Sequence, residues 1–164
     1  MEMFLIQWTA RWAVCGYLAR IWVEIDDRSK VSTRMLARRW WTFGCVGFVL
    51  HVICAFHFAH HWSHAAAWEA TARRTAEMTG WYSGWGLAVN EGFLVLWIGD
   101  TILWWRNLAW PENRIIFRSI QLVFAFLMIQ ATVVFGPPVW KWVAFVVLAM
   151  ILIRRRVLVR QHRS

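Results

Sequence analysis

Long apolar stretches, separated by short polar or basic connections, dominate the pattern of this chain. Most of them approach the roughly 20 residues that a helix needs to cross the hydrocarbon core of a bilayer. They run over residues 4–23, 41–62, 87–105, 115–135 and 139–153. The pattern predicts an all-α integral membrane protein: a bundle of five, or alternatively four, transmembrane helices that forms a single membrane-embedded domain over residues 1–164.

The first stretch decides between five helices and four. Arg11 and Arg20 interrupt it and leave only short apolar runs. If residues 4–23 span the membrane, the two arginines can extend toward opposite faces on their aliphatic stems. If they do not, the segment lies in the interface as an amphipathic helix. We favour the prediction of five spanning helices.

The connection after the second stretch is more than a plain loop. Its sequence AAAWEATARRTAEM is rich in helix formers and contains neither Gly nor Pro. It predicts a short helical extension at about 65–79, on the outer face of the membrane, that ends at Gly80. Trp81, Tyr82 and Trp85 follow, and amphipathic rings of this kind gather at the membrane interface.

The net charge of +9 changes meaning once the chain is placed in a membrane. In a soluble protein it would suggest nucleic acid, but the sequence carries no nucleic-acid-binding motif. Thirteen of the 18 Lys and Arg fall in the stretches 24–39, 106–118 and 154–164. Lys and Arg are enriched on the cytoplasmic side. The distribution therefore predicts an inner-membrane protein with a cytoplasmic C-terminus and anionic lipid around the basic tail.

Four of the six histidines fall within the run HFAHHWSH, at His57, His60, His61 and His64. On one continuous helix these positions span an arc of about 100° and form a single stripe. A row of imidazoles at the end of an apolar helix is costly unless it has partners. The run therefore indicates a binding site close to the periplasmic face.

Polar residues of other stretches fall at a similar depth. Counting from the helix ends places Asn90, Glu91, Gln130 and Thr132 in the same outer third of the bilayer as the histidines. Lipid cannot satisfy polar groups at that depth, so we expect them to face the bundle interior or a wet cavity. Glu91 has an alternative partner in Arg11, if the first stretch spans the membrane.

The residue types favour a transition metal. Neutral imidazole suits Cu, Zn and Fe, and a carboxylate can complete the site. The pairs His57/His61 and His60/His64 have the i, i+4 spacing that lets one helix supply two ligands. The predicted metal ligands are His57, His60, His61, His64 and Glu91. Cys54, on the edge of this face, is expected to be a small buried hydrophobe, with a role as a soft ligand as the alternative.

Two resemblances bear on the cofactor. The HxxHH spacing over His57–His61 resembles one histidine box of the membrane di-iron hydroxylases and desaturases, enzymes that need about three boxes where this chain has one. A haem b held between paired histidines resembles the membrane cytochromes b, but here the intramembrane histidines share one helix. Haem ligation would instead need His51 with a residue such as Met128, or a histidine of another subunit.

The leading hypothesis is a small inner-membrane protein that binds a transition metal, or haem, for electron transfer or metal handling. The alternative is a structural or accessory subunit of a larger membrane complex or homo-oligomer, without chemistry of its own. Neither enzymatic activity nor catalytic residues follow from the sequence. Asp100, near the cytoplasmic end of its stretch, is expected to find a basic or hydroxyl partner on the first or fourth stretch, because an unpaired charge there is costly.

Overall fold

The structure is a computed structural model. It describes residues 1–25, 30–110 and 114–134, together with positions 142–143, 145–147, 149–151, 153–154 and 156. Within these residues the regular structure is entirely helical, without a strand, as the sequence predicts. The fifth apolar stretch lies partly outside the described residues, and its described positions are helical.

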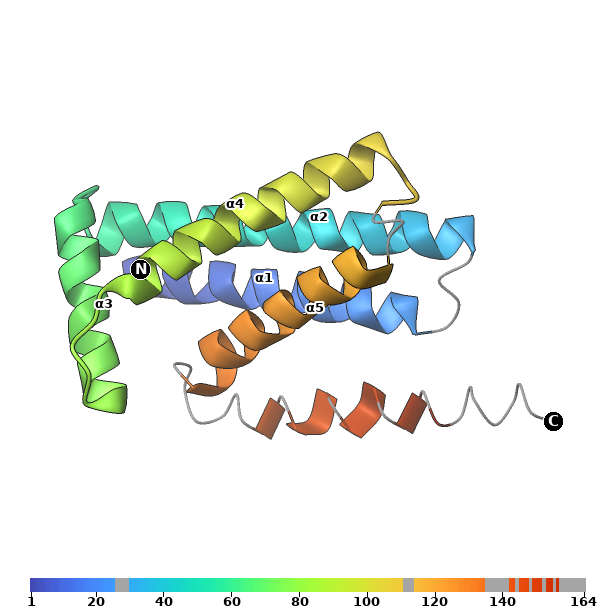
Figure 1. Cartoon of the computed structure of the whole chain (residues 1–164). Coiled ribbons are helices and arrows are strands. Elements are labelled where there is room, and N and C mark those ends of the chain that lie inside the picture. Colours follow the sequence, from blue (N-terminus) through green and yellow to red (C-terminus); the bar gives the residue numbers. More distant parts are fainter. Residues whose placement is uncertain are drawn as a thin grey trace.

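Five α-helices and two π-helical turns follow one another along the described chain (Figure 1). They are α1 (Glu2–Glu24), α2 (Val31–Cys54), η1 (Ala55–Ala59), α3 (His64–Thr79), α4 (Trp85–Arg106), α5 (Arg114–Ile129) and η2 (Gln130–Val134). The helices α1 and α2 run antiparallel, α4 and α5 cross them at an angle, and α3 lies across one end of the bundle.

Three helical segments of the described part are long and apolar enough to cross a bilayer. They are Val31–Ala59, Trp85–Arg106 and Ile115–Thr132. The helix α1 has sufficient length, with 23 residues, but it is not among the three because Arg11, Arg20 and Glu24 lower its hydropathy. The structure therefore supports an integral membrane bundle, with three helices that qualify by length and composition alone.

The contact between α1 and α2 is the most extensive in the bundle, and small residues make it close. Gly16 of α1 faces Gly44 of α2, and a Cβ atom added at Gly16 would overlap the Gly44 backbone. Ala13 and Ala37, on the two helices, are fully buried beside it. Small residues let helix backbones approach within a membrane bundle, where dispersion contacts replace the hydrophobic effect.

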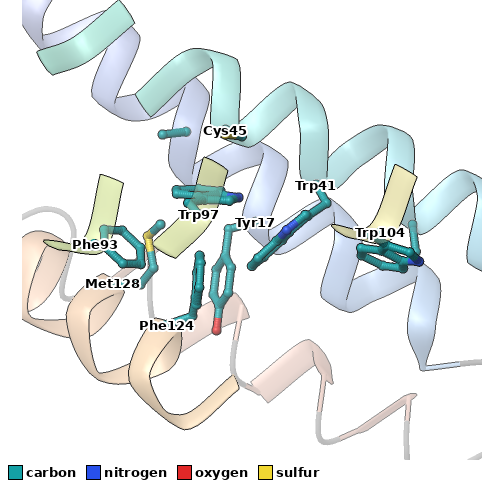
Figure 2. Close-up of a cluster of buried hydrophobic side chains, with 10 residues drawn as sticks. Tyr17, Trp41, Cys45, Phe93, Trp97, Trp104, Phe124 and Met128 are labelled. Carbon is teal, nitrogen blue, oxygen red and sulfur yellow. The ribbon is translucent and has the colours of Figure 1, made fainter. Parts of the chain in front are cut away.

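A cluster of aromatic rings joins α4 and α5 to α1 and α2 (Figure 2). Trp41 of α2 lies 5.1 Å from Trp97 of α4 and 4.5 Å from Phe124 of α5, measured between ring centroids. All three side chains are 0% exposed. Tyr17 of α1 stacks on Phe124 at 6.4 Å. Tilted and edge-on ring pairs at these distances add about 0.5–1.5 kcal/mol each beyond the area they bury.

Arg20 of α1 is buried within this bundle, with 2% of its surface exposed. Its guanidinium donates to Gln121 of α5 and lies 3.1 Å from the Glu24 carboxylate. It also lies 4.6 Å from the centroid of the Trp41 ring. A buried cation needs several such partners to offset its desolvation. Arg20 is therefore an internal crosslink between α1, α2 and α5.

The expectation for Asp100 is met only in part: Arg20 of α1 is close enough to act on the Asp100 carboxyl through its charge, but the hydrogen-bond donor is a different side chain. The indole N–H of Trp110, in the segment after α4, donates to the Asp100 carboxyl at 2.9 Å. No basic or hydroxyl side chain of the described residues forms a hydrogen bond with Asp100. The chain turns back after Arg106, and this turn brings Trp110 to the buried carboxyl, which sequence distance alone did not reveal.

The close helix contact predicts opposite effects for two glycine substitutions. G16A should destabilise the bundle by about 1–3 kcal/mol, because the added methyl forces α1 away from Gly44. G92A is the matched control, since a Cβ at Gly92 of α4 meets no atom within 4 Å, and alanine has the higher helix propensity. Thermal unfolding of the purified variants in detergent micelles measures both. Equal stability of G16A and G92A would show that α1 and α2 are not in close contact.

The Asp100 contact predicts a second pair of effects. W110F removes the N–H donor and should cost about 1.5–3 kcal/mol, the usual value for a hydrogen bond to a charged acceptor. W105F is the control: its indole N–H bonds the neutral Thr42 hydroxyl at 2.8 Å on the exposed surface, and its loss should cost about 1 kcal/mol or less. The free energy of unfolding in micelles compares the two variants. A larger loss of stability in W105F than in W110F would contradict the hydrogen bond between Trp110 and Asp100.

Candidate functional site

The histidine run does not continue one straight helix. The α-helix α2 ends at Cys54, the π-helical turn η1 covers Ala55–Ala59, and α3 begins at His64 after a break. At the break, His61 and Trp62 have φ angles of 48° and 60°, a region that large side chains rarely occupy. The prediction of a single stripe on one helix is therefore wrong.

Local hydrogen bonds explain the break. The Ser63 hydroxyl accepts from the Ala66 backbone N–H at 3.2 Å and so caps α3. The Trp62 and Ser63 backbone N–H groups donate to the carbonyls of Phe56 and His60. Serine at this position starts a new helix, because its side chain replaces the partner that the first N–H groups lack. The helix predicted at about 65–79 is present as α3, and Gly80 ends it with a φ of 76°.

The change of direction turns His57 and His61 outward. Both are exposed on the surface of the bundle, so the expectation that their rings point into it is wrong. His57 Nδ1 accepts a hydrogen bond from the Trp62 indole at 3.1 Å. The i, i+4 geometry that would have placed His57 and His61 on one face is lost, because the chain leaves the helical path after Ala59.

His64 and Glu91 do come together. His64 Nε2 lies 2.9 Å from the Glu91 carboxylate, a contact that joins the first residue of α3 to α4. The two side chains are 62% and 42% exposed, so the pair is open to the surroundings. Glu91 pairs with His64 and forms no ion pair with Arg11, which corrects the alternative partner.

His60 and His64 both lie beside the ring of Phe56. The Phe56 ring is 6.0 Å from the His60 ring and 6.4 Å from the His64 ring, measured between centroids. Partial burial, with a smaller contribution from the nearby His61, lowers the pKa of His60 below its usual value. The neutral imidazole that metals bind therefore persists to lower pH at His60 than at an ordinary histidine.

The five predicted ligands do not converge as a whole. Within residues 1–25, 30–110 and the other described positions, no three His, Cys, Asp or Glu side chains are grouped closely enough to hold a metal ion. The structure joins His64 to Glu91, places His60 beside Phe56, and leaves His57 and His61 exposed on the surface. Cys54 is a free, half-buried thiol.

A second feature of the same part of the bundle is a cavity of about 170 Å³. Polar side chains reach it from α1 (Gln7 and Arg11), α2 (His51), α4 (Asn90) and the π-helical turn η2 (Thr132). The predicted polar layer is thus present in part, through Asn90 and Thr132, whereas Gln130 is not among the lining residues. Gln7 was missed, and Arg11 and His51 were considered only as a partner of Glu91 and as a haem ligand, because depth counting alone does not show which helix faces meet.

His51 has a fixed orientation in this cavity. Its Nδ1 lies 3.0 Å from the Ile6 carbonyl of α1. Because a carbonyl only accepts, Nδ1 carries the proton and Nε2 is left as an acceptor in the neutral ring. His51 and Met128 line the same cavity, and haem ligation by this pair stays a prediction.

No known protein family, curated protein or solved structure matches this chain. Inference about its function therefore comes from the geometry of the two sites at this end of the bundle.

Proposed function

We propose that this chain is an inner-membrane protein with five spanning helices and a cytoplasmic C-terminus. The arrangement of the elements supports this topology. The end of α1, the start of α2, the end of α4 and the start of α5 lie at one end of the bundle, and α3 lies at the other (Figure 1). The described parts of the first two basic stretches, residues 30–39 and 106–110 with 114–118, lie at the first of these ends, which supports a cytoplasmic face there.

Two contacts support a spanning role for α1 and the position of the tail. The helix α1 packs along α2, which is itself part of a candidate span, so both would cross the bilayer together. The Arg154 guanidinium lies 4.2 Å from the centroid of the Trp22 ring. This contact puts the start of the basic tail beside the C-terminal part of α1, at the basic end of the bundle.

The topology predicts which added cysteines are accessible from outside. In a variant that lacks the three native cysteines, S83C should react with a membrane-impermeant maleimide in intact cells, because Ser83 lies between α3 and α4. S164C should react only after the membrane is permeabilised. For both variants, labelling is measured as the increase in apparent mass of the protein on a gel. Labelling in the reverse order would overturn the orientation.

We further propose that the chain binds a transition metal, Cu, Zn or Fe, at the α3–α4 end of the bundle. The contact of 2.9 Å between His64 Nε2 and the Glu91 carboxylate carries this proposal. Imidazole nitrogen and carboxylate oxygen are the usual protein ligands of these ions. A cation between them would take the place of the direct contact.

The neighbouring histidines supply further donors. His60 is the candidate third ligand, because its ring lies beside the same Phe56 ring as that of His64. No third ligand of the described residues is in place beside His64 and Glu91, so His60 would have to move to complete the site. His57 and His61 are exposed next to it and serve as outer donors on the path of the ion. A site with three protein ligands keeps a position open for exchange, which suits metal handling or electron transfer at the periplasmic face.

Metal content after purification tests this site. The full chain in phosphatidylcholine nanodiscs, loaded with Cu²⁺ or Zn²⁺ and dialysed, should retain close to one ion per chain by elemental analysis. H64Q and E91Q should each lower the affinity by about 10–100-fold or more, because each removes a direct ligand. A visible absorption spectrum of the Cu²⁺ form should change in H60Q.

Matched controls keep the result specific. E77Q removes an exposed carboxylate that pairs with Arg74 on α3, and H162Q removes a histidine of the C-terminal tail. Both should retain the metal. Retention of the full metal content in the H64Q/E91Q double variant would refute the site, as would absence of binding in the unmodified chain.

A further inference from the structure

The cavity between α1, α2, α4 and η2 is distinct from the His64–Glu91 pair. It lies within the apolar part of the bundle: His51 is eight residues before the end of the span Val31–Ala59, about 12 Å along the helix axis. None of the five predicted metal ligands lines it. What the cavity binds is therefore a question independent of the proposed metal site.

Several polar groups face this cavity without a partner elsewhere. The Arg11 guanidinium contacts the Trp8 ring at 5.1 Å, and within the described part of the chain it pairs with no carboxylate. The side-chain amides of Gln7 and Asn90 form no hydrogen bond to any described residue. Gln7 and Asn90 are exposed and Arg11 is half-buried, so all three are accessible to a ligand that enters the cavity. Polar groups that converge on one pocket in this way mark a binding site.

The groups differ in hydrogen-bonding character. Arg11, Gln7 and Asn90 offer N–H donors. The His51 ring offers an acceptor, because its Nδ1 proton is directed at the Ile6 carbonyl. A ligand that fits must therefore present an oxygen that accepts from Arg11 or an amide, and a group that can donate to His51 Nε2.

The walls and the size restrict the ligand further. The remaining lining is mainly apolar, with the rings of Phe48 and Phe93 and the thioether of Met128. A volume of about 170 Å³ suits one six-membered ring with small substituents, since a cavity of about 150 Å³ holds benzene. Apolar walls with a single cation disfavour a phosphate group, which several cationic or N–H donors would surround.

We propose that this cavity binds the ring of an isoprenoid quinol from the bilayer. Such a ring has hydroxyls at opposite positions, and each hydroxyl can both accept and donate a hydrogen bond. One hydroxyl oxygen accepts from Arg11 or Asn90, and the other hydroxyl donates to His51 Nε2. Phe48 and Phe93 pack against the ring, and the isoprenoid tail extends into the surrounding lipid.

Equilibrium binding of a benzoquinol with a ten-carbon tail, kept reduced under anaerobic conditions, tests the proposal. The full chain in phosphatidylcholine nanodiscs should bind one molecule per chain saturably. R11Q and H51L should each weaken binding about tenfold or more, the consequence of losing one buried hydrogen bond. A131F, which introduces a ring at a lining position, should block binding without removing a polar group.

Two variants outside the cavity serve as controls. R39Q, at an exposed position of α2, and H162L should bind as the unmodified chain does, and circular dichroism should confirm that all variants are folded. Unchanged binding in R11Q, H51L and A131F would overturn the proposal. Binding of inorganic phosphate in place of the quinol, or no saturable quinol binding, would also overturn it and leave the metal proposal intact.

Discussion

The rest of the bundle depends on the close approach of α1 and α2. Two glycines, Gly16 and Gly44, leave no side chain between the backbones, so the helices meet closely along most of their length. Gly44 also leaves space for the Trp97 ring, which a Cβ there would meet at 2.9 Å. The same pair of glycines therefore fixes α1 against α2 and admits α4, on which the aromatic cluster around Trp41 and Phe124 is built.

Two arginines of α1 show how the same residue type serves different purposes in an apolar bundle. Arg20 is enclosed by Gln121, Glu24 and the Trp41 ring, so its donors and its charge are largely satisfied by the protein. Arg11 lies about two and a half helical turns away and contacts a single ring beside an open cavity. An enclosed cation contributes to assembly, whereas one at a cavity is free to bind a ligand.

The break after Ala59 places two candidate sites at the same end of the protein. It directs α3 across the bundle, so that His64 meets Glu91 at the surface, while His51, before the break, stays among the helices with Arg11 and Asn90. A metal ion bound by His64 and Glu91 and a quinol ring bound in the cavity would lie at the same end of α4, because Asn90 of the cavity is adjacent to Glu91 in the sequence. Such an arrangement would suit electron transfer at the periplasmic face, and the separate tests of the two sites decide it.

Apolar length, basic connections and helix-forming composition are local properties, and from them the sequence by itself determined the helical membrane class, most helix positions and the extension that became α3. It also placed Asn90 and Thr132 at the depth of the cavity, because depth follows from counting residues along a helix. Helix faces and partners were decided only by the tertiary structure. Ser63 capping and the backbone at His61 and Trp62 ended the histidine stripe, and packing chose His64 for Glu91 and Trp110 for Asp100. These outcomes depend on contacts between residues far apart in the chain, which periodicity within one segment does not encode.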